Sequence, residues 1–157
     1  MNVCFIKTSH QEYTLECTRD NGSVTRVTLE AKSYLKHDMV HFVYEREAQL
    51  NDSFYGMVNA GCELESLTPQ AMKTASIDSS EEALTTEIIV GTLQGALVNE
   101  TLPSDMNTRL ADYIVLQGRS APPHLTMDLL ERVFKETKQL INRYAQLKTG
   151  ERLCETL

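Results

Sequence analysis

The spacing of apolar residues changes at Ser33, and this change limits the fold more than any other feature of the chain. Before Ser33, residues 3–7, 12–18 and 24–31 alternate apolar with polar side chains and are rich in threonine, valine and aromatic residues. Alternation with this composition is typical of strands that bury one face. After Ser33, apolar residues recur at helical spacing. The sequence therefore predicts an α+β fold.

A turn around Gly22 should join the second and third strands. A two-residue loop would place Leu15 opposite Thr28, an apolar side chain against a polar one. A three-residue loop, with Gly22 in a left-handed bulge, places Leu15 opposite Val27 instead. We therefore expect the longer loop, because it gives the hairpin one apolar and one polar face.

Helical spacing, N-cap residues and terminating glycines divide the rest of the chain. Thr68-Pro69 predicts a further helix start, and residues 74–82 have the composition of a loop. We expect an N-terminal three-stranded antiparallel sheet followed by a bundle of four or five helices, in one domain over residues 1–150. Residues 151–157 contain few apolar side chains and are predicted to be a frayed tail. The helices are expected near residues 34–51, 52–61, 81–99, 104–117 and 126–150.

Length and composition exclude several classes of protein. The 157 residues suit a single core, and 41% hydrophobic with 24% charged residues is ordinary globular usage. A net charge of -7 opposes binding to the phosphates of nucleic acid. The sequence shows neither a signal peptide nor an apolar run long enough for a membrane helix. We therefore expect a cytoplasmic protein without nucleic-acid or membrane partners, whose four scattered cysteines are reduced.

The segment from His37 to Glu45 contains the residues that most resemble a functional site. His37, His41 and Glu45 are spaced four residues apart, with Asp38 beside them, so a helix would place them on one stripe. Two imidazoles one turn apart can share a metal ion such as zinc, while an adjacent acid activates a bound water. The pattern predicts His37 and His41 as metal ligands. Asp38, as the base, and Glu45, as support for the ligands, are the catalytic candidates.

Such a site needs a third protein ligand. Glu45 lies about 12 Å along a helix axis from His37 and therefore cannot bind the same ion. The missing ligand must come from elsewhere in the chain. Sequence spacing does not choose among four candidates, which are His124, Asp112, Glu63 and Glu65.

A purely structural interpretation competes with the metal site. Asp38 is a good N-cap residue, and a helix that began after it would leave His37 outside. His41 would then be a core or boundary histidine paired with Glu45. A polar pocket without metal is the third interpretation of the same residues. The sequence leaves all three open.

The same stretch resembles a family of small uncharacterised bacterial proteins. Members share a Pro-His-Asp-x-x-His-x-x-x-Glu segment and a later aromatic-glycine pair. These correspond here to residues 37–45 and to Tyr55-Gly56, with Lys36 at the position of the proline. The family brings no established activity. The resemblance implies that this cluster is where a function should be sought.

Two functions follow from the sequence. A non-enzymatic protein-interaction module is ranked first, because the chain lacks a glycine-rich phosphate loop, a nucleophile elbow and a Cys-His pairing. Its long C-terminal helix and acidic surface would meet another protein or a second copy of the chain. The alternative is a metal-binding, hydrolytic domain built on His37, Asp38, His41 and Glu45. Whether the protein is an enzyme is left undecided.

Overall fold

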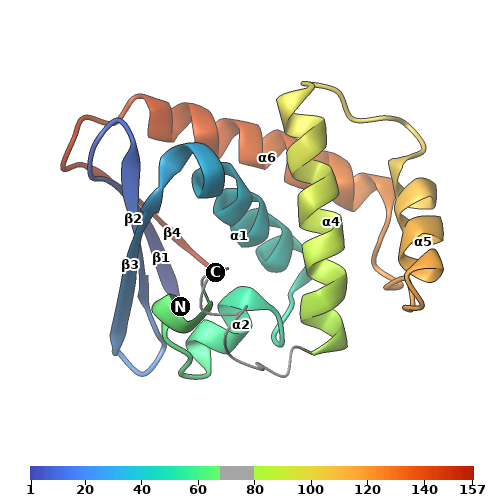
Figure 1. The fold of residues 1–157 in the computed structure, drawn as a ribbon, viewed down its shortest axis with the longest axis horizontal. Coiled ribbons are helices and arrows are strands. Elements are labelled where there is room, and N and C mark those ends of the chain that lie inside the picture. The colour runs from blue at the N-terminus through green and yellow to red at the C-terminus, as the bar shows by residue number, and fades with distance from the viewer. Residues whose placement is uncertain (68–79) are drawn as a thin grey trace.

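A four-stranded antiparallel sheet lies at one end of the molecule, with helices on one of its sides (Figure 1). The computed structural model describes residues 1–67 and 80–157. The strand order is β3-β2-β1-β4. The α+β class is confirmed. The strands are β1 (Asn2–Lys7), β2 (Glu12–Thr18), β3 (Val24–Glu30) and β4 (Arg152–Thr156).

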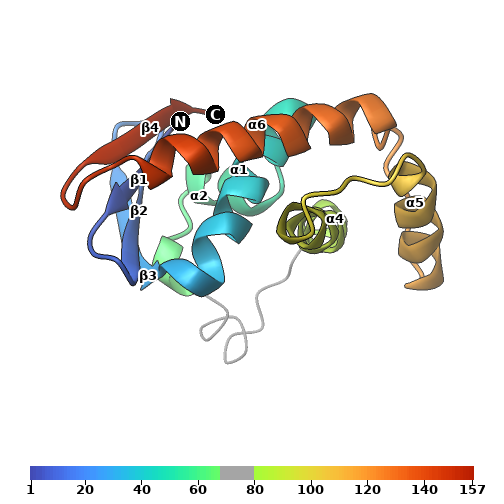
Figure 2. The same ribbon diagram turned by 90° about the horizontal axis from the view of Figure 1, so that it is seen from above.

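The helices lie at increasing distances from the sheet. Helices α1 and α6 lie beside the sheet, α4 lies beyond α1, and α5 is farthest away (Figure 2). Two short helical turns are also present: η1 (Ala31–Leu35) directly precedes α1, and η2 (Leu64–Leu67) follows α2. The helices are α1 (Lys36–Ala48), α2 (Phe54–Asn59), α4 (Glu81–Val98), α5 (Met106–Leu116) and α6 (Met127–Ala145).

The hairpin between β2 and β3 has the expected register. Leu15 pairs with Val27, and Gly22 has a φ of +84°, in the left-handed region. The three-residue loop is therefore confirmed, and its physical reason is the one given by the sequence. It keeps apolar side chains together on the face that packs against the helices.

Aromatic side chains join the sheet to the first two helices. The ring of Phe5 on β1 meets that of Phe42 on α1 edge to face, with centroids 6.1 Å apart. Phe42 in turn meets Tyr55 on α2 at 5.9 Å. All three side chains are fully buried. These contacts fix α1 and α2 against the sheet, which matters because α1 carries the histidines.

The predicted frayed tail is wrong, because residues 152–156 form strand β4 and pair with β1. Only Leu153 of this strand is buried. Strand β4 is held by backbone hydrogen bonds to β1, which is distant in sequence. The composition of residues 151–157 alone therefore does not indicate the strand. The domain therefore extends beyond residue 150.

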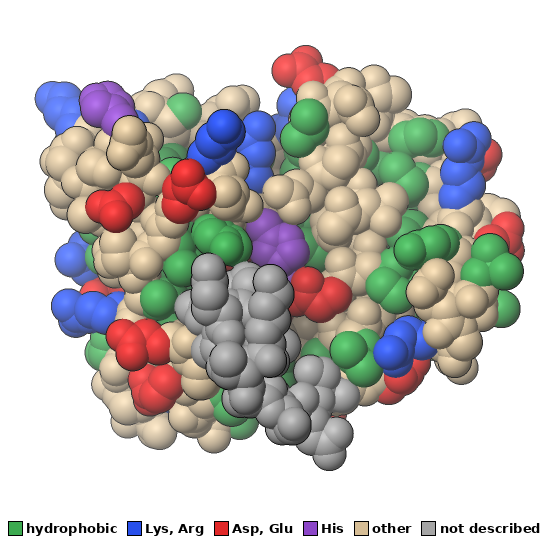
Figure 3. Space-filling view, viewed as in Figure 1, with side chains coloured by type: hydrophobic (Ala, Val, Ile, Leu, Met, Phe, Trp, Pro, Cys, Tyr) green, Lys and Arg blue, Asp and Glu red, His purple; other side chains and the backbone are tan. Residues whose placement is uncertain are grey.

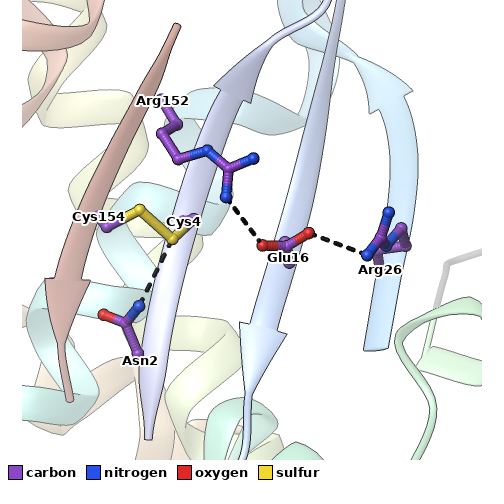
Figure 4. The surroundings of a disulfide bond; sticks show 6 residues. All are labelled: Asn2, Cys4, Glu16, Arg26, Arg152 and Cys154. Atoms are coloured by element: carbon purple, nitrogen blue, oxygen red, sulfur yellow. Dashed lines mark hydrogen bonds and ion pairs between the residues drawn. A yellow bond between two sulfur atoms is a disulfide. The ribbon is translucent and has the colours of Figure 1, made fainter. Parts of the chain in front are cut away.

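Cys4 on β1 and Cys154 on β4 form a disulfide, so the prediction of reduced thiols is wrong for these two residues. Figure 4 shows the bond on the face of the sheet that also carries Glu16. Cys17 and Cys62 are free, and burial raises the pKa of Cys17 to about 12. Disulfides are typical of oxidising surroundings, which bears against the cytoplasmic location expected from the sequence.

Two local predictions concern the chain between η2 and α4. The helix start at Thr68-Pro69 lies outside the described residues. The predicted loop over 74–82 is wrong at its end, because Ser80 caps α4 by accepting a hydrogen bond from the amide of Ala83. Among the described residues, no helix is long and apolar enough to cross a membrane.

The disulfide should contribute strongly to stability, since it closes a loop across nearly the whole chain. We expect the double variant Cys4→Ser/Cys154→Ser to lower the free energy of unfolding by about 2–4 kcal/mol in denaturant titrations. Cys62→Ser, at an exposed free cysteine, is the matched control and should leave it unchanged. Equal midpoints for the double variant and the wild type would show that the bond does not constrain the unfolded chain.

Candidate metal centre

Helix α1 begins before the histidines. Strand β3 passes directly into η1 and then into α1, whose N-cap is Leu35. Asp38 therefore lies inside the helix, and the interpretation of Asp38 as an N-cap is wrong. His37 and His41 keep their one-turn relation, and their ring centroids are 4.7 Å apart.

Helix α4 packs against α1 and brings Glu87 to the two imidazoles. Oε1 of Glu87 lies 3.1 Å from Nε2 of His41, and Oε2 lies 3.6 Å from Nε2 of His37. One ligand atom from each of the three residues falls within 4.8 Å of the others. Among the described residues, these three form a group suited to hold a metal ion.

Glu87 is the acid that sequence reasoning missed. The four residues considered as a third ligand lie elsewhere: His124 meets the hydroxyl of Tyr44 at 3.0 Å, and Glu63 pairs with Arg19. Asp112 is exposed on α5, and Glu65 lies in η2. One signal was available, because Glu87 is the single charged residue between Glu82 and Glu100 in a largely apolar helix.

Glu45 sits behind His41, where it makes two hydrogen bonds. Its Oε1 lies 2.9 Å from Nδ1 of His41, and its Oε2 accepts a hydrogen bond of 2.9 Å from the amide of Tyr55. Tyr55 is in the first turn of α2, whose free amides need acceptors. With Nδ1 held in this way, Nε2 of His41 is directed at Glu87. A carboxylate on the second nitrogen is the usual partner of a metal-binding histidine.

Gly56 allows α2 to sit close enough for this contact. A Cβ at this position would lie 2.0 Å from the carbonyl oxygen of Asn51, so no other residue fits without moving the backbone. The aromatic-glycine pair of the sequence thus has a physical role. It seats the first turn of α2 beside Glu45.

Asp38 faces the sheet. Its carboxylate accepts a hydrogen bond from the hydroxyl of Tyr13 on β2, and its backbone carbonyl accepts one of 3.1 Å from the hydroxyl of Tyr55. Burial raises the pKa of Asp38 to about 6, although the hydrogen bond from Tyr13 opposes this. Asp38 does not belong to the group of close ligand atoms. These contacts anchor α1 to the sheet. They give no direct support to the predicted catalytic role of Asp38.

The cluster is strongly coupled electrostatically. Burial favours the neutral form of His41, but the contacts with Glu45 and Glu87 outweigh it and raise the pKa to about 10. For His37, burial and the charge of His41 lower the pKa. Burial favours the neutral form of Glu87, yet the two histidines lower its pKa. Two carboxylates around one buried imidazole thus make a site that favours positive charge.

One buried atom of the cluster is not satisfied. His41 is 2% exposed, and its Nε2 has no hydrogen-bond partner in the described part of the chain. The 3.1 Å approach of Glu87 is an ion-pair contact without hydrogen-bond geometry. A buried polar atom in this state needs an explanation, and binding of an ion is one of the usual ones. Glu87 is half exposed, so the site is open to solvent.

Comparisons with protein-family models, curated proteins and solved structures found no match. The resemblance of residues 37–45 to a bacterial family therefore stays a prediction. A functional interpretation has to come from the chemistry of the cluster.

The hydrogen bonds of Glu45 yield a test of the geometry. Glu45→Ala would leave His41 and the amide of Tyr55 without their buried acceptor, and we expect it to lower the free energy of unfolding by about 3–5 kcal/mol. Glu47→Ala, a partly exposed ion-pairing residue on the same helix, should lower it by less than about 1 kcal/mol. Chemical denaturation measures both. Similar losses for the two variants would mean that Glu45 does not organise the site.

Proposed function

We propose that this protein binds a divalent metal ion, zinc or a similar first-row ion, through His37, His41 and Glu87. The observation that carries the proposal is the convergence of these three side chains from two helices, with ligand atoms within 4.8 Å of one another. Two imidazoles and one carboxylate form a ligand set typical of zinc.

The surroundings of the three ligands support the same function. Glu45 accepts the hydrogen of His41 Nδ1, which leaves Nε2 free to coordinate. Gln94 Oε1 lies 3.3 Å from Nδ1 of His37, so this ring also has a partner on its second nitrogen. Both histidines would therefore present Nε2 to the ion. Hydrogen bonds of this kind fix ring orientation before a metal arrives.

Three protein ligands leave one coordination position for water or a substrate oxygen. This arrangement is typical of catalytic zinc sites, whereas structural sites usually have four protein ligands. A bound metal would polarise that oxygen or lower the pKa of a bound water. The chain's own residues hold the ion, orient the rings and bury one side of the site. The proposal is thus a metal-binding domain with an exchangeable position, and we rank it above the interaction module that the sequence placed first.

Metal titration tests this directly. Chelator-treated protein should bind one Zn²⁺ per chain in isothermal titration calorimetry. Loss of a ligand should weaken zinc affinity by at least about a hundredfold. Loss of a residue that only hydrogen-bonds to a ligand weakens metal affinity by up to about that factor. Glu87→Gln is the main variant, because this half-exposed side chain keeps its size and the fold should persist. His41→Ala should have the same effect.

His10→Ala is the matched control, since His10 is an exposed histidine outside the cluster. It should bind zinc as the wild type does. Wild-type protein that binds no zinc, or variants that all bind alike, would contradict the proposed function.

One surface feature favours self-association as a second function. Helix α5 exposes Tyr113, Val115 and Leu116, and Leu116 is 81% exposed. Exposed apolar side chains gathered on one helix are typical of contact surfaces. This keeps the interaction module as a proposal, with a second copy of the chain as the partner.

Sedimentation velocity tests this second function. Wild-type protein should sediment as an oligomer and Leu116→Glu as a monomer, because the charge would have to be buried in the contact. Val24→Glu changes an exposed apolar residue on β3 and should leave the oligomer intact. A monomeric wild type would rule out self-association through α5.

A further inference from the structure

The proposed metal ligands line part of a larger cavity. This cavity has a volume of about 280 Å³, and His37, His41 and Glu87 belong to its lining. Figure 3 shows histidine and acidic side chains beside hydrophobic ones in the middle of this face of the molecule. An ion held by the three ligands would therefore face an enclosed space as well as solvent.

The remaining lining is mostly apolar. Leu15, Val27 and Leu29 of the hairpin contribute to it from the sheet, and Leu84 contributes from α4. A cavity with apolar walls and a few convergent polar groups is the usual form of a site for a small organic molecule. By scaling from a 150 Å³ cavity that holds benzene, this one holds about eleven non-hydrogen atoms.

Ser53 adds a polar contact to the same cavity. Its side chain is fully buried and lines the cavity, and its Oγ has no hydrogen-bond partner among the described residues. Ser53 is the N-cap residue of α2, yet its side chain makes no capping bond. Glu45 takes the amide of Tyr55 in the first turn of that helix. The hydroxyl of Ser53 is thereby left for another partner, and a buried hydroxyl without one is unfavourable.

We infer that the cavity binds a small, largely aliphatic molecule with one oxygen-bearing head group, such as a medium-chain carboxylic acid or its acyl derivative. This inference rests on the proposed metal site, because the head-group oxygen would take the free position on the ion. The chain would lie against Leu15, Val27 and Leu29. Ser53 Oγ is a hydrogen-bond partner for a polar atom of the ligand.

A chain-length series tests this inference. Protein is loaded with Co²⁺, whose visible spectrum reports a change in coordination, and titrated with straight-chain hydroxamic acids of two, four, six and eight carbons. Affinity should rise about fourfold for each methylene group buried. The eight-carbon hydroxamic acid has about as many non-hydrogen atoms as the cavity is estimated to hold.

Val27→Phe is the informative variant, because it narrows the cavity from a half-buried strand position without touching a ligand residue. It should keep the cobalt spectrum but lose the gain in affinity for the six- and eight-carbon compounds. Val24→Phe, at an exposed position of the same strand, is the matched control and should behave as wild type.

The two proposals fail in different ways. Protein that binds no cobalt refutes the metal site and this inference with it. Protein that binds cobalt, yet shows the same affinity for two- and eight-carbon compounds, overturns this inference alone. The same holds if Val27→Phe keeps the full dependence on chain length.

Discussion

The buried carboxylate of Glu45 is the interaction on which the proposed site depends most. One oxygen holds Nδ1 of His41 and the other accepts the amide of Tyr55, so a single side chain links α1 to the start of α2. This contact sets the direction of Nε2 toward Glu87. It also frees the hydroxyl of Ser53 from capping α2. The orientation of the imidazole, the seating of α2 and one polar group of the cavity therefore share one cause.

The sheet provides the rigid base for this arrangement. The hydroxyl of Tyr13 and the carboxylate of Asp38 join β2 to α1 just beside the first histidine. On the other side of the sheet, the disulfide between Cys4 and Cys154 ties the last strand to the first. Two short helical segments, η2 and α2, and the packed helix α4 then leave a cavity above the hairpin. A site built from the sheet and from α1, α2, η2 and α4 requires each of these contacts to hold its geometry.

Features set by local sequence could be predicted, and features set by distant partners could not. Alternation and turn chemistry gave the register of Leu15 with Val27, because both act within a hairpin. Helical spacing brought His37 and His41 together for the same reason. The interpretation of Asp38 as an N-cap fails because η1 continues the chain from β3 directly into α1, so the helix begins before Asp38. Glu87 and β4 were missed because helix packing and strand pairing across the chain leave no local pattern.

A crystal structure of the zinc-loaded protein, with anomalous data collected at the zinc edge, tests the central claim most directly. The account predicts one strong peak at about 2.0–2.2 Å from a nitrogen of His37, Nε2 of His41 and an oxygen of Glu87. It also predicts that Glu45 stays on Nδ1 of His41 without touching the ion. A peak at other residues, or crystals that contain zinc with none at this cluster, would contradict it.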